Sequence, residues 1–391
     1  MSTRKARHPG AAVRLWVIPP AVLTDVGTHM SEAGILGEHA PGAGLFLWNL
    51  ARDLTLWATT DAESRPHLFR ADVMRHRSRE LVSSGLPPEV AAWLDLLLSV
   101  VYESSCAASP GGILTDAVRR LARWAERGGM AETALTLAQA AALAEPLDAR
   151  AAMLAGDTAL TFGRLTRADS WFQRAVAIAR RVRDRHTYSG SYRRLGDVYV
   201  RQRRYAEAED RFRRGLRAAR RHKSTRTEAV EALIGLVEVA IAAGRYEDAL
   251  GWERRAARVV THDEARQANL AGACVDLWMW KEDFGRALQG LEALWMDAIT
   301  VAQRMYLLAR IAHAAAGAGE RARLGDAWGE AWQLAHEPKS GTAQDRFRTF
   351  LELSRAAELG GDPLRARSAL QAAAANANGG DDETRSRRSA A

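Results

Sequence analysis

Residues 190–221 read GSYRRLGDVYVRQRRYAEAEDRFRRGLRAARR, and this stretch decides the fold. Leu195 and Tyr199 lie four residues apart, which places both side chains on one face of a first helix. Ala208 and Phe212 have the same spacing further along, where they form one face of a second helix. A small and a large apolar residue on facing surfaces can interlock. The stretch therefore predicts two helices packed as a hairpin.

Related stretches recur on both sides of this one, so the chain contains an internal repeat. Each has a short polar or glycine-containing turn followed by a residue that opens the second helix. These opening residues are Ala131, Leu165, Tyr205, Tyr246 and Phe284, spaced 34, 40, 41 and 38 residues apart. Two weaker copies follow at residues 317–328 and 360–370. Regular spacing over this length predicts a stack of helix hairpins.

The pattern Tyr192-x2-Leu195-Gly196-x2-Tyr199, followed by Ala208-x3-Phe212, resembles the tetratricopeptide repeat. Tyr192 stands where tryptophan is typical of the family. Repeat spacings near 40 residues are similar to the extended-helix variant of signalling scaffolds and of the sensor regions of bacterial regulators. The resemblance covers residues 113–376. It implies an all-α fold, a right-handed α-solenoid of five or six helix hairpins with a concave ligand-binding surface.

The remaining segments do not follow the repeat. We expect residues 11–110 to form a helical N-terminal cap, because a solenoid needs its end covered. Residues 1–10 and the tail 377–391 are expected to be disordered. The helices predicted within the cap are 44–59, 66–83 and 87–104.

The resemblance also implies where a ligand binds. In the family, the first helix of each pair lines the groove, and the residue after the small glycine or alanine site faces it. Asparagine is common there, whereas this chain has carboxylates, which accept hydrogen bonds but do not donate them. A ligand with basic or amide groups is therefore implied. The candidate groove residues are Asp157, Arg193, Arg194, Asp197, Arg201, Glu238 and Asp276. The structural alternative is that these acids pair with neighbouring arginines and bind nothing.

The positive charge is concentrated in one part of the chain. The net charge is +8, but residues 180–226 hold 17 Arg and Lys against five Asp and Glu, a net +12. One interpretation is a patch for an acidic partner or nucleic acid. The other is the solvated face of amphipathic helices. We do not expect nucleic-acid binding, because no helix-turn-helix, RNA-binding or zinc-finger signature is present.

No motif for catalysis was found. The chain lacks nucleotide-binding loops, HExxH and GxSxG, and its histidines do not have metal-ligand spacing. Cys106 and Cys274 form no disulfide framework or CxxC pair. We therefore expect no enzyme activity, cofactor or metal. No segment is suited to spanning a membrane, and we expect a cytoplasmic protein.

These observations predict a scaffold or adaptor that binds a protein or peptide in its groove. One alternative is a regulatory sensor that binds a small peptide or metabolite and changes its superhelix. Another is an enzyme whose site lies in residues 11–110. A third is nucleic-acid association through the Arg180–Arg226 block. The sequence leaves the oligomeric state open.

Overall fold

The computed structural model describes residues 29–61, 63–103, 113–219, 225–260, 263–296, 298, 300–337 and 340–389. The predictions for residues 1–10 and for the beginning of the cap, 11–28, lie outside this part of the chain. The chain divides into two compact units, Met1–Thr225 and Arg226–Ala391. Each unit is described by itself.

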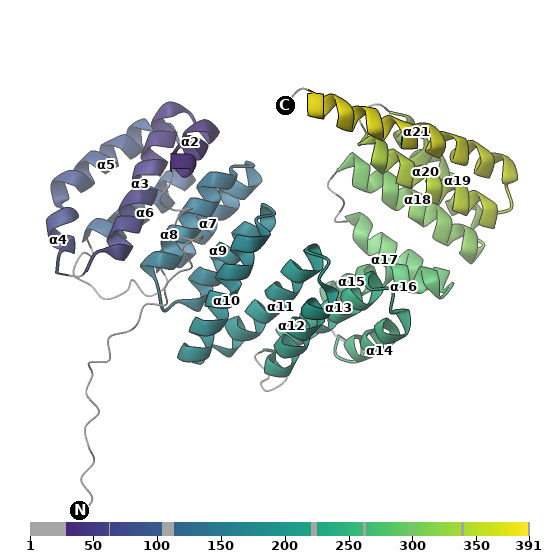
Figure 1. The fold of residues 1–391 in the computed structure, drawn as a ribbon, viewed down its shortest axis with the longest axis horizontal. Helices are drawn as coiled ribbons and strands as arrows, with labels where there is room; N and C mark the ends of the chain where they lie inside the picture. Colours follow the sequence, from purple (N-terminus) through teal and green to yellow (C-terminus); the bar gives the residue numbers. More distant parts are fainter. Residues whose placement is uncertain are drawn as a thin grey trace, which may run out of the picture. The chain divides into compact units, whose positions relative to one another are not determined.

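The first unit begins with helices outside the repeat and continues with three helix pairs, whose helices lie side by side (Figure 1). The helices outside the repeat are α2 (His29–Glu38), α3 (Pro41–Thr59), α4 (Arg65–Leu68), α5 (Ala71–Ser83) and α6 (Pro88–Glu103). The pairs are α7 (Ile113–Arg127) with α8 (Ala131–Ala144), α9 (Ala149–Thr161) with α10 (Leu165–Val182), and α11 (Arg185–Arg201) with α12 (Tyr205–Ala219).

The helices before the repeat share one apolar core with the first pair. Phe46, Trp57 and Leu97 belong to the same buried cluster as Leu121 and Leu137 of α7 and α8. A polar contact closes this junction. The carboxylate of Glu38 accepts hydrogen bonds from the backbone N–H groups of Glu132 (2.8 Å) and Thr133 (2.9 Å), at the N-terminal end of α8.

The second unit consists of four helix pairs in its described residues. They are α13 (Arg226–Ala242) with α14 (Tyr246–Ala257), α15 (Glu264–Ala273) and α16 (Val275–Trp280) with α17 (Phe284–Met296), α18 (Val301–Ala318) with α19 (Arg321–His336), and α20 (Ala343–Leu359) with α21 (Pro363–Ser389). The two weak sequence copies at 317–328 and 360–370 fall at the turns of the last two pairs. An all-helical fold of repeated hairpins is thereby confirmed.

One turn geometry joins the helices within every pair. The second residue before the second helix has a positive φ, and it is glycine in five of the seven turns. The next N–H donates to a carbonyl five residues back, as Arg204 does to Tyr199 (2.8 Å). This is the Schellman arrangement that ends a helix with a left-handed residue. The opening residues expected from the sequence, from Ala131 to Phe284, all begin their second helices.

Two of these turns place a bulky residue where the others have glycine. Arg203 has φ 59° and Glu282 has φ 59°. We expect Arg203→Gly to raise the free energy of unfolding by about 0.5 kcal/mol. The left-handed conformation costs a residue with a Cβ atom about 1–2 kcal/mol, and glycine removes this strain. Glycine also increases the entropy of the unfolded chain, which cancels part of the gain. Urea unfolding measures the change.

The neighbouring residue provides the control for this prediction. Arg204 lies at the N-terminal end of α12 without a positive φ, so Arg204→Gly has no strain to relieve and should lower the free energy of unfolding. If Arg203→Gly destabilises the protein as much as Arg204→Gly does, the left-handed strain is not a stability cost here.

Glycines within the first helices allow the hairpins to close. A Cβ atom added at Gly156 would lie 2.6 Å from the ring of Phe172, and one added at Gly196 would lie 2.6 Å from the ring of Phe212. Both rings are completely buried. The close approach inferred from Gly196 is therefore present, and it is repeated one hairpin earlier.

Two expectations outside the repeat need correction. The helix expected over 66–83 is divided into α4 and α5, because Phe69 turns inward between them and packs edge-on against Tyr102, with ring centroids 5.6 Å apart. The tail expected to be disordered is helical in α21 up to Ser389. That helix contains four consecutive alanines at 372–375, and alanine has the highest helix propensity.

Candidate functional site

The first helices of neighbouring pairs in the first unit carry the predicted site residues. Asp157 follows Gly156 in α9, and Asp197 follows Gly196 in α11. Since consecutive residues of a helix point about 100° apart, a carboxylate next to a buried glycine lies beside the hairpin seam. Both side chains are partly exposed, with 32% of Asp157 and 25% of Asp197 accessible.

Two arginines of α11 lie between these carboxylates. Arg194 Nε is 2.8 Å from Asp157 Oδ1, and Arg194 Nη1 is 3.6 Å from Asp197 Oδ2. Arg193 Nη1 donates a hydrogen bond to Asp197 Oδ2 at 3.0 Å. The structure thus brings four predicted residues into one network across α9 and α11. We call Asp157, Arg193, Arg194 and Asp197 the groove cluster.

The remaining predicted arginine of this unit has a structural contact. Arg201 Nη1 donates to the carbonyl oxygen of Leu160 at 2.7 Å, near the C-terminal end of α9. That carbonyl also accepts a hydrogen bond from the backbone N–H of Gly163 at 3.1 Å, and a cation is favoured at this end by the helix dipole. Arg201 therefore fastens α11 to α9 and also lies close enough to act on the charge of Asp197.

The surroundings of the groove cluster disfavour the ionised form of its two carboxylates. Burial raises the pKa of Asp157, and the charges of Arg194 and Arg193 oppose this rise without cancelling it. Burial likewise raises the pKa of Asp197 against the same two arginines. Burial also raises the pKa of Glu126 in α7, a rise that the charge of Asp157 increases and a hydrogen bond with Thr158 opposes. Glu126 was missed by the sequence analysis.

The cluster retains hydrogen-bonding capacity. Asp157 Oδ1 and Arg194 Nε are close enough to form an ion pair, but neither forms an aligned hydrogen bond with another described atom. Buried polar atoms usually have such partners. These two atoms are buried against each other and hold the two side chains together, so only the exposed parts of the side chains are within reach of a bound group.

The other two predicted acids lie in the second unit. Asp276 of α16 forms an ion pair with Arg310 of α18. Glu238 is exposed on α13, and its charge helps burial to raise the pKa of Cys274 to about 12. A continuous row of acids joining Asp157, Asp197, Glu238 and Asp276 stays a prediction, since these residues fall in separate units.

Sequence analysis missed Arg310, the partner of Asp276, and a further ionisable pair at the same helical positions. His313 Nδ1 of α18 lies 3.0 Å from Glu352 Oε2 of α20. Burial raises the pKa of Glu352, but the hydrogen bond with His313 and the charges of His313 and Arg355 outweigh it and leave the pKa below its usual value. Asp157–Arg194, Asp276–Arg310 and His313–Glu352 each join the first helices of successive pairs, 34 to 39 residues apart. Aligning the turns and reading the same helical position would have found them.

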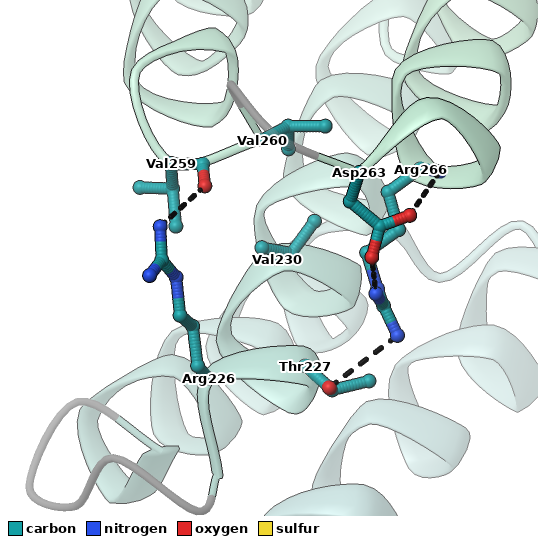
Figure 2. Close-up of a pocket in the computed structure, with 7 residues that line it drawn as sticks. All are labelled: Arg226, Thr227, Val230, Val259, Val260, Asp263 and Arg266. Atoms are coloured by element: carbon teal, nitrogen blue, oxygen red, sulfur yellow. Dashed lines mark hydrogen bonds and ion pairs between the residues drawn. The ribbon is translucent and has the colours of Figure 1, made fainter.

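A cavity of about 240 Å³ lies at the adjoining ends of α13, α14 and α15 (Figure 2). Val230, Val259 and Val260 form its apolar wall. Its arginines have protein partners, because Arg226 donates to the carbonyl of Val259 at 3.0 Å and Arg266 bonds with Asp263 and Thr227. None of the residues that line this cavity was predicted as a site residue.

A metal site and a membrane-spanning helix are both absent from the described residues. No group of three or more His, Cys, Asp or Glu side chains there is arranged to hold a metal ion. None of the helices described has the length and apolar character needed to cross a membrane.

Comparisons with known proteins identify the repeat. Residues 147–221 and 191–261 match the family profile described as "Tetratricopeptide repeat". No curated protein matches the sequence.

Several solved structures are similar to the chain. PilF of Pseudomonas aeruginosa is 18% identical, covering 56% of this chain and 91% of its own with a TM-score of 0.44. BtubC from P. vanneervenii is 16% identical, covering 68% and 92% with a TM-score of 0.37. A Rap protein crystallised with Competence and Sporulation Factor is 10% identical, covering 85% and 98% with a TM-score of 0.44.

Proposed function

We propose that this chain, which contains tetratricopeptide repeats, is a non-enzymatic scaffold or adaptor that binds a protein or peptide segment on the first helices of its repeats. The observation that carries the proposal is the groove cluster. Asp157 and Asp197 are kept partly buried with raised pKa values, although apolar or neutral residues at these positions would avoid that cost. Strongly perturbed ionisable groups of this kind gather at functional sites.

The chemistry of the cluster fits a polypeptide. Two carboxylates accept hydrogen bonds and two guanidinium groups donate them, within one surface formed by α9 and α11. A peptide backbone offers both donors and acceptors, and a basic side chain complements Asp157 or Asp197. The side chains of Asp157 and Arg194 are each 32% exposed, which leaves part of both groups within reach of such a ligand.

The groove cluster predicts that one substitution can preserve the stability of the protein and abolish binding of its partner. Because the two aspartate pKa values are raised in the folded protein, their contribution to stability is present below the ordinary aspartate pKa and is lost as pH rises through the raised values. Asparagine imitates the protonated form. We therefore expect Asp157→Asn/Asp197→Asn to be at least as stable as the parent at neutral pH and to lose the partner.

Affinity capture of the tagged full chain from a nuclease-treated extract of its own cells tests the binding. Mass spectrometry would compare the parent, Asp157→Asn/Asp197→Asn and Arg193→Glu/Arg194→Glu. The matched control is Arg254→Glu/Arg255→Glu, which reverses two adjacent exposed arginines on a second helix. A partner captured by the parent and the control but not by the groove variants supports the proposal. Identical partners for all four proteins would exclude the groove cluster.

A further inference from the structure

Six arginines lie in the residues where α10 ends, α11 begins and α12 ends. The loop between α10 and α11 contains only Arg183 and Asp184. The α11–α12 hairpin aligns the other ends, because Ser189 Oγ donates to the carbonyl of Gly215 at 2.9 Å. We call this surface the basic edge. It consists of Arg180, Arg181, Arg183, Arg185, Arg214 and Arg217, all exposed.

Most of the positive charge on the basic edge is not compensated. Arg214 forms an ion pair with Asp210, Nε to Oδ2 at 2.9 Å. The nearby Asp184 accepts from the backbone N–H (3.1 Å) and the hydroxyl (2.5 Å) of Thr187. The other five arginines have no carboxylate within ion-pair distance among the described residues. The segment between α12 and α13, residues 220–224, contains no acidic residue in its sequence. The arginines of the groove cluster, in contrast, are all paired.

Local helix electrostatics account for only part of this arrangement. Arg180, Arg181 and Arg217 lie in the last turns of α10 and α12, where the helix dipole favours a cation, and Arg183 is the C-cap residue of α10. Arg185 lies in the first turn of α11, beside the N-cap residue Asp184, where the same effect disfavours a cation by about 0.3–1 kcal/mol. The dipole does not explain why five exposed arginines without an ion pair are concentrated on one edge, and this concentration indicates an external partner.

Two tyrosines lie within the basic edge and add hydrogen-bond donors. The rings of Tyr188 and Tyr192 meet edge to face, with centroids 5.1 Å apart. Burial and the neighbouring Tyr192 raise the pKa of Tyr188, so the phenol remains protonated, and the charges of Arg180 and Arg214 oppose this rise. Arg214 also lies near Tyr192.

We propose that the basic edge binds an acidic segment of another polypeptide, at a surface separate from the groove cluster. Separate Glu and Asp side chains of such a segment can each reach one guanidinium while avoiding Asp184 and Asp210. A nucleic-acid backbone, whose phosphates follow at fixed intervals, would approach those two carboxylates. Tyr188 and Tyr192 are half-buried and pack against each other, unlike the open rings on which the bases of single strands stack.

Fluorescence anisotropy of the full chain with a labelled peptide of alternating glutamate and serine tests this inference. We expect binding that weakens between about 50 and 200 mM salt, because charge attraction between exposed groups is screened. Arg181→Glu/Arg183→Glu/Arg185→Glu should weaken the binding at least about tenfold. We expect this variant to fold, because all three side chains are exposed and glutamate is favoured at the N-terminal end of α11, where Arg185 lies.

The matched control is Arg254→Glu/Arg255→Glu/Arg258→Glu, which makes the same change in net charge on the exposed side of α14. Its affinity for the peptide should stay within about twofold of the parent, because screening limits the reach of exposed charges. If both variants lose the same affinity for the peptide, the effect depends on overall charge alone, and the proposal is overturned. Absence of peptide binding at low salt, or tighter binding of a labelled oligothymidylate, would overturn it as well.

Discussion

Replacing Arg77 by methionine lowers the free energy of unfolding by about 3–5 kcal/mol, the usual cost of removing one partner of a buried ion pair. Arg77 and Asp53 are 6% and 5% exposed, and Arg77 Nε lies 2.8 Å from Asp53 Oδ2. Tyr102 donates its hydroxyl to the same oxygen at 2.8 Å. These three residues join α5, α3 and α6, so the loss affects most of the region before the repeat.

Two further variants isolate the charge. Asp53→Asn/Arg77→Met removes both ions and should recover much of the loss, because replacing a whole buried pair by neutral residues is often close to neutral. Tyr102→Phe deletes one hydrogen bond and should cost about 1 kcal/mol. Urea unfolding gives the total change, and hydrogen exchange over residues 41–103 locates it. A double variant less stable than Arg77→Met would show that the pair does not act through its charge.

The repeat fold could be predicted because it depends on local sequence features. Gly196 and Phe212 meet at the seam, and Tyr205 follows a turn that needs a left-handed residue. Such features recur at one spacing and can be recognised without the structure. Before residue 113, Phe69 interrupts a helical pattern only because its ring reaches Tyr102 of another helix, which no local pattern reveals.

The groove cluster could be predicted only in part. The position after each glycine is a local property, so Asp157 and Asp197 were found. The pairing of Asp157 with Arg194 depends on how far one hairpin is shifted against the next, because it joins α9 to α11. His313 and Glu352 were missed for the same reason, because their contact joins α18 to α20.

The structure shows the ion pairs that the structural alternative for the predicted acids requires, while a binding role of these acids stays a prediction. Asp157, Asp197 and Asp276 all pair with arginines, as the structural alternative required. Pairing does not make Asp157 and Asp197 inert, because burial still raises their pKa values. The groove cluster is better described as alternating charges than as a row of free acids.

The seam of the α11–α12 hairpin carries the other large expected effect. Phe212→Ala should lower the free energy of unfolding by about 3–5 kcal/mol, the usual cost of truncating a buried phenylalanine. Its ring is completely buried and lies directly over Gly196, so the surrounding backbone cannot collapse easily into the space. Urea unfolding followed by circular dichroism measures the change.

The double variant Gly196→Ala/Phe212→Ala tests whether this cost comes from the empty space. Alone, Gly196→Ala should be destabilising, because its methyl group would lie 2.6 Å from the ring of Phe212. Without the ring, the same methyl group occupies part of the cavity, and alanine favours the helix by about 1 kcal/mol. The two substitutions should therefore compensate each other, with a coupling of about 0.5–3 kcal/mol. Strictly additive losses would mean that the ring and the glycine do not share this space in solution.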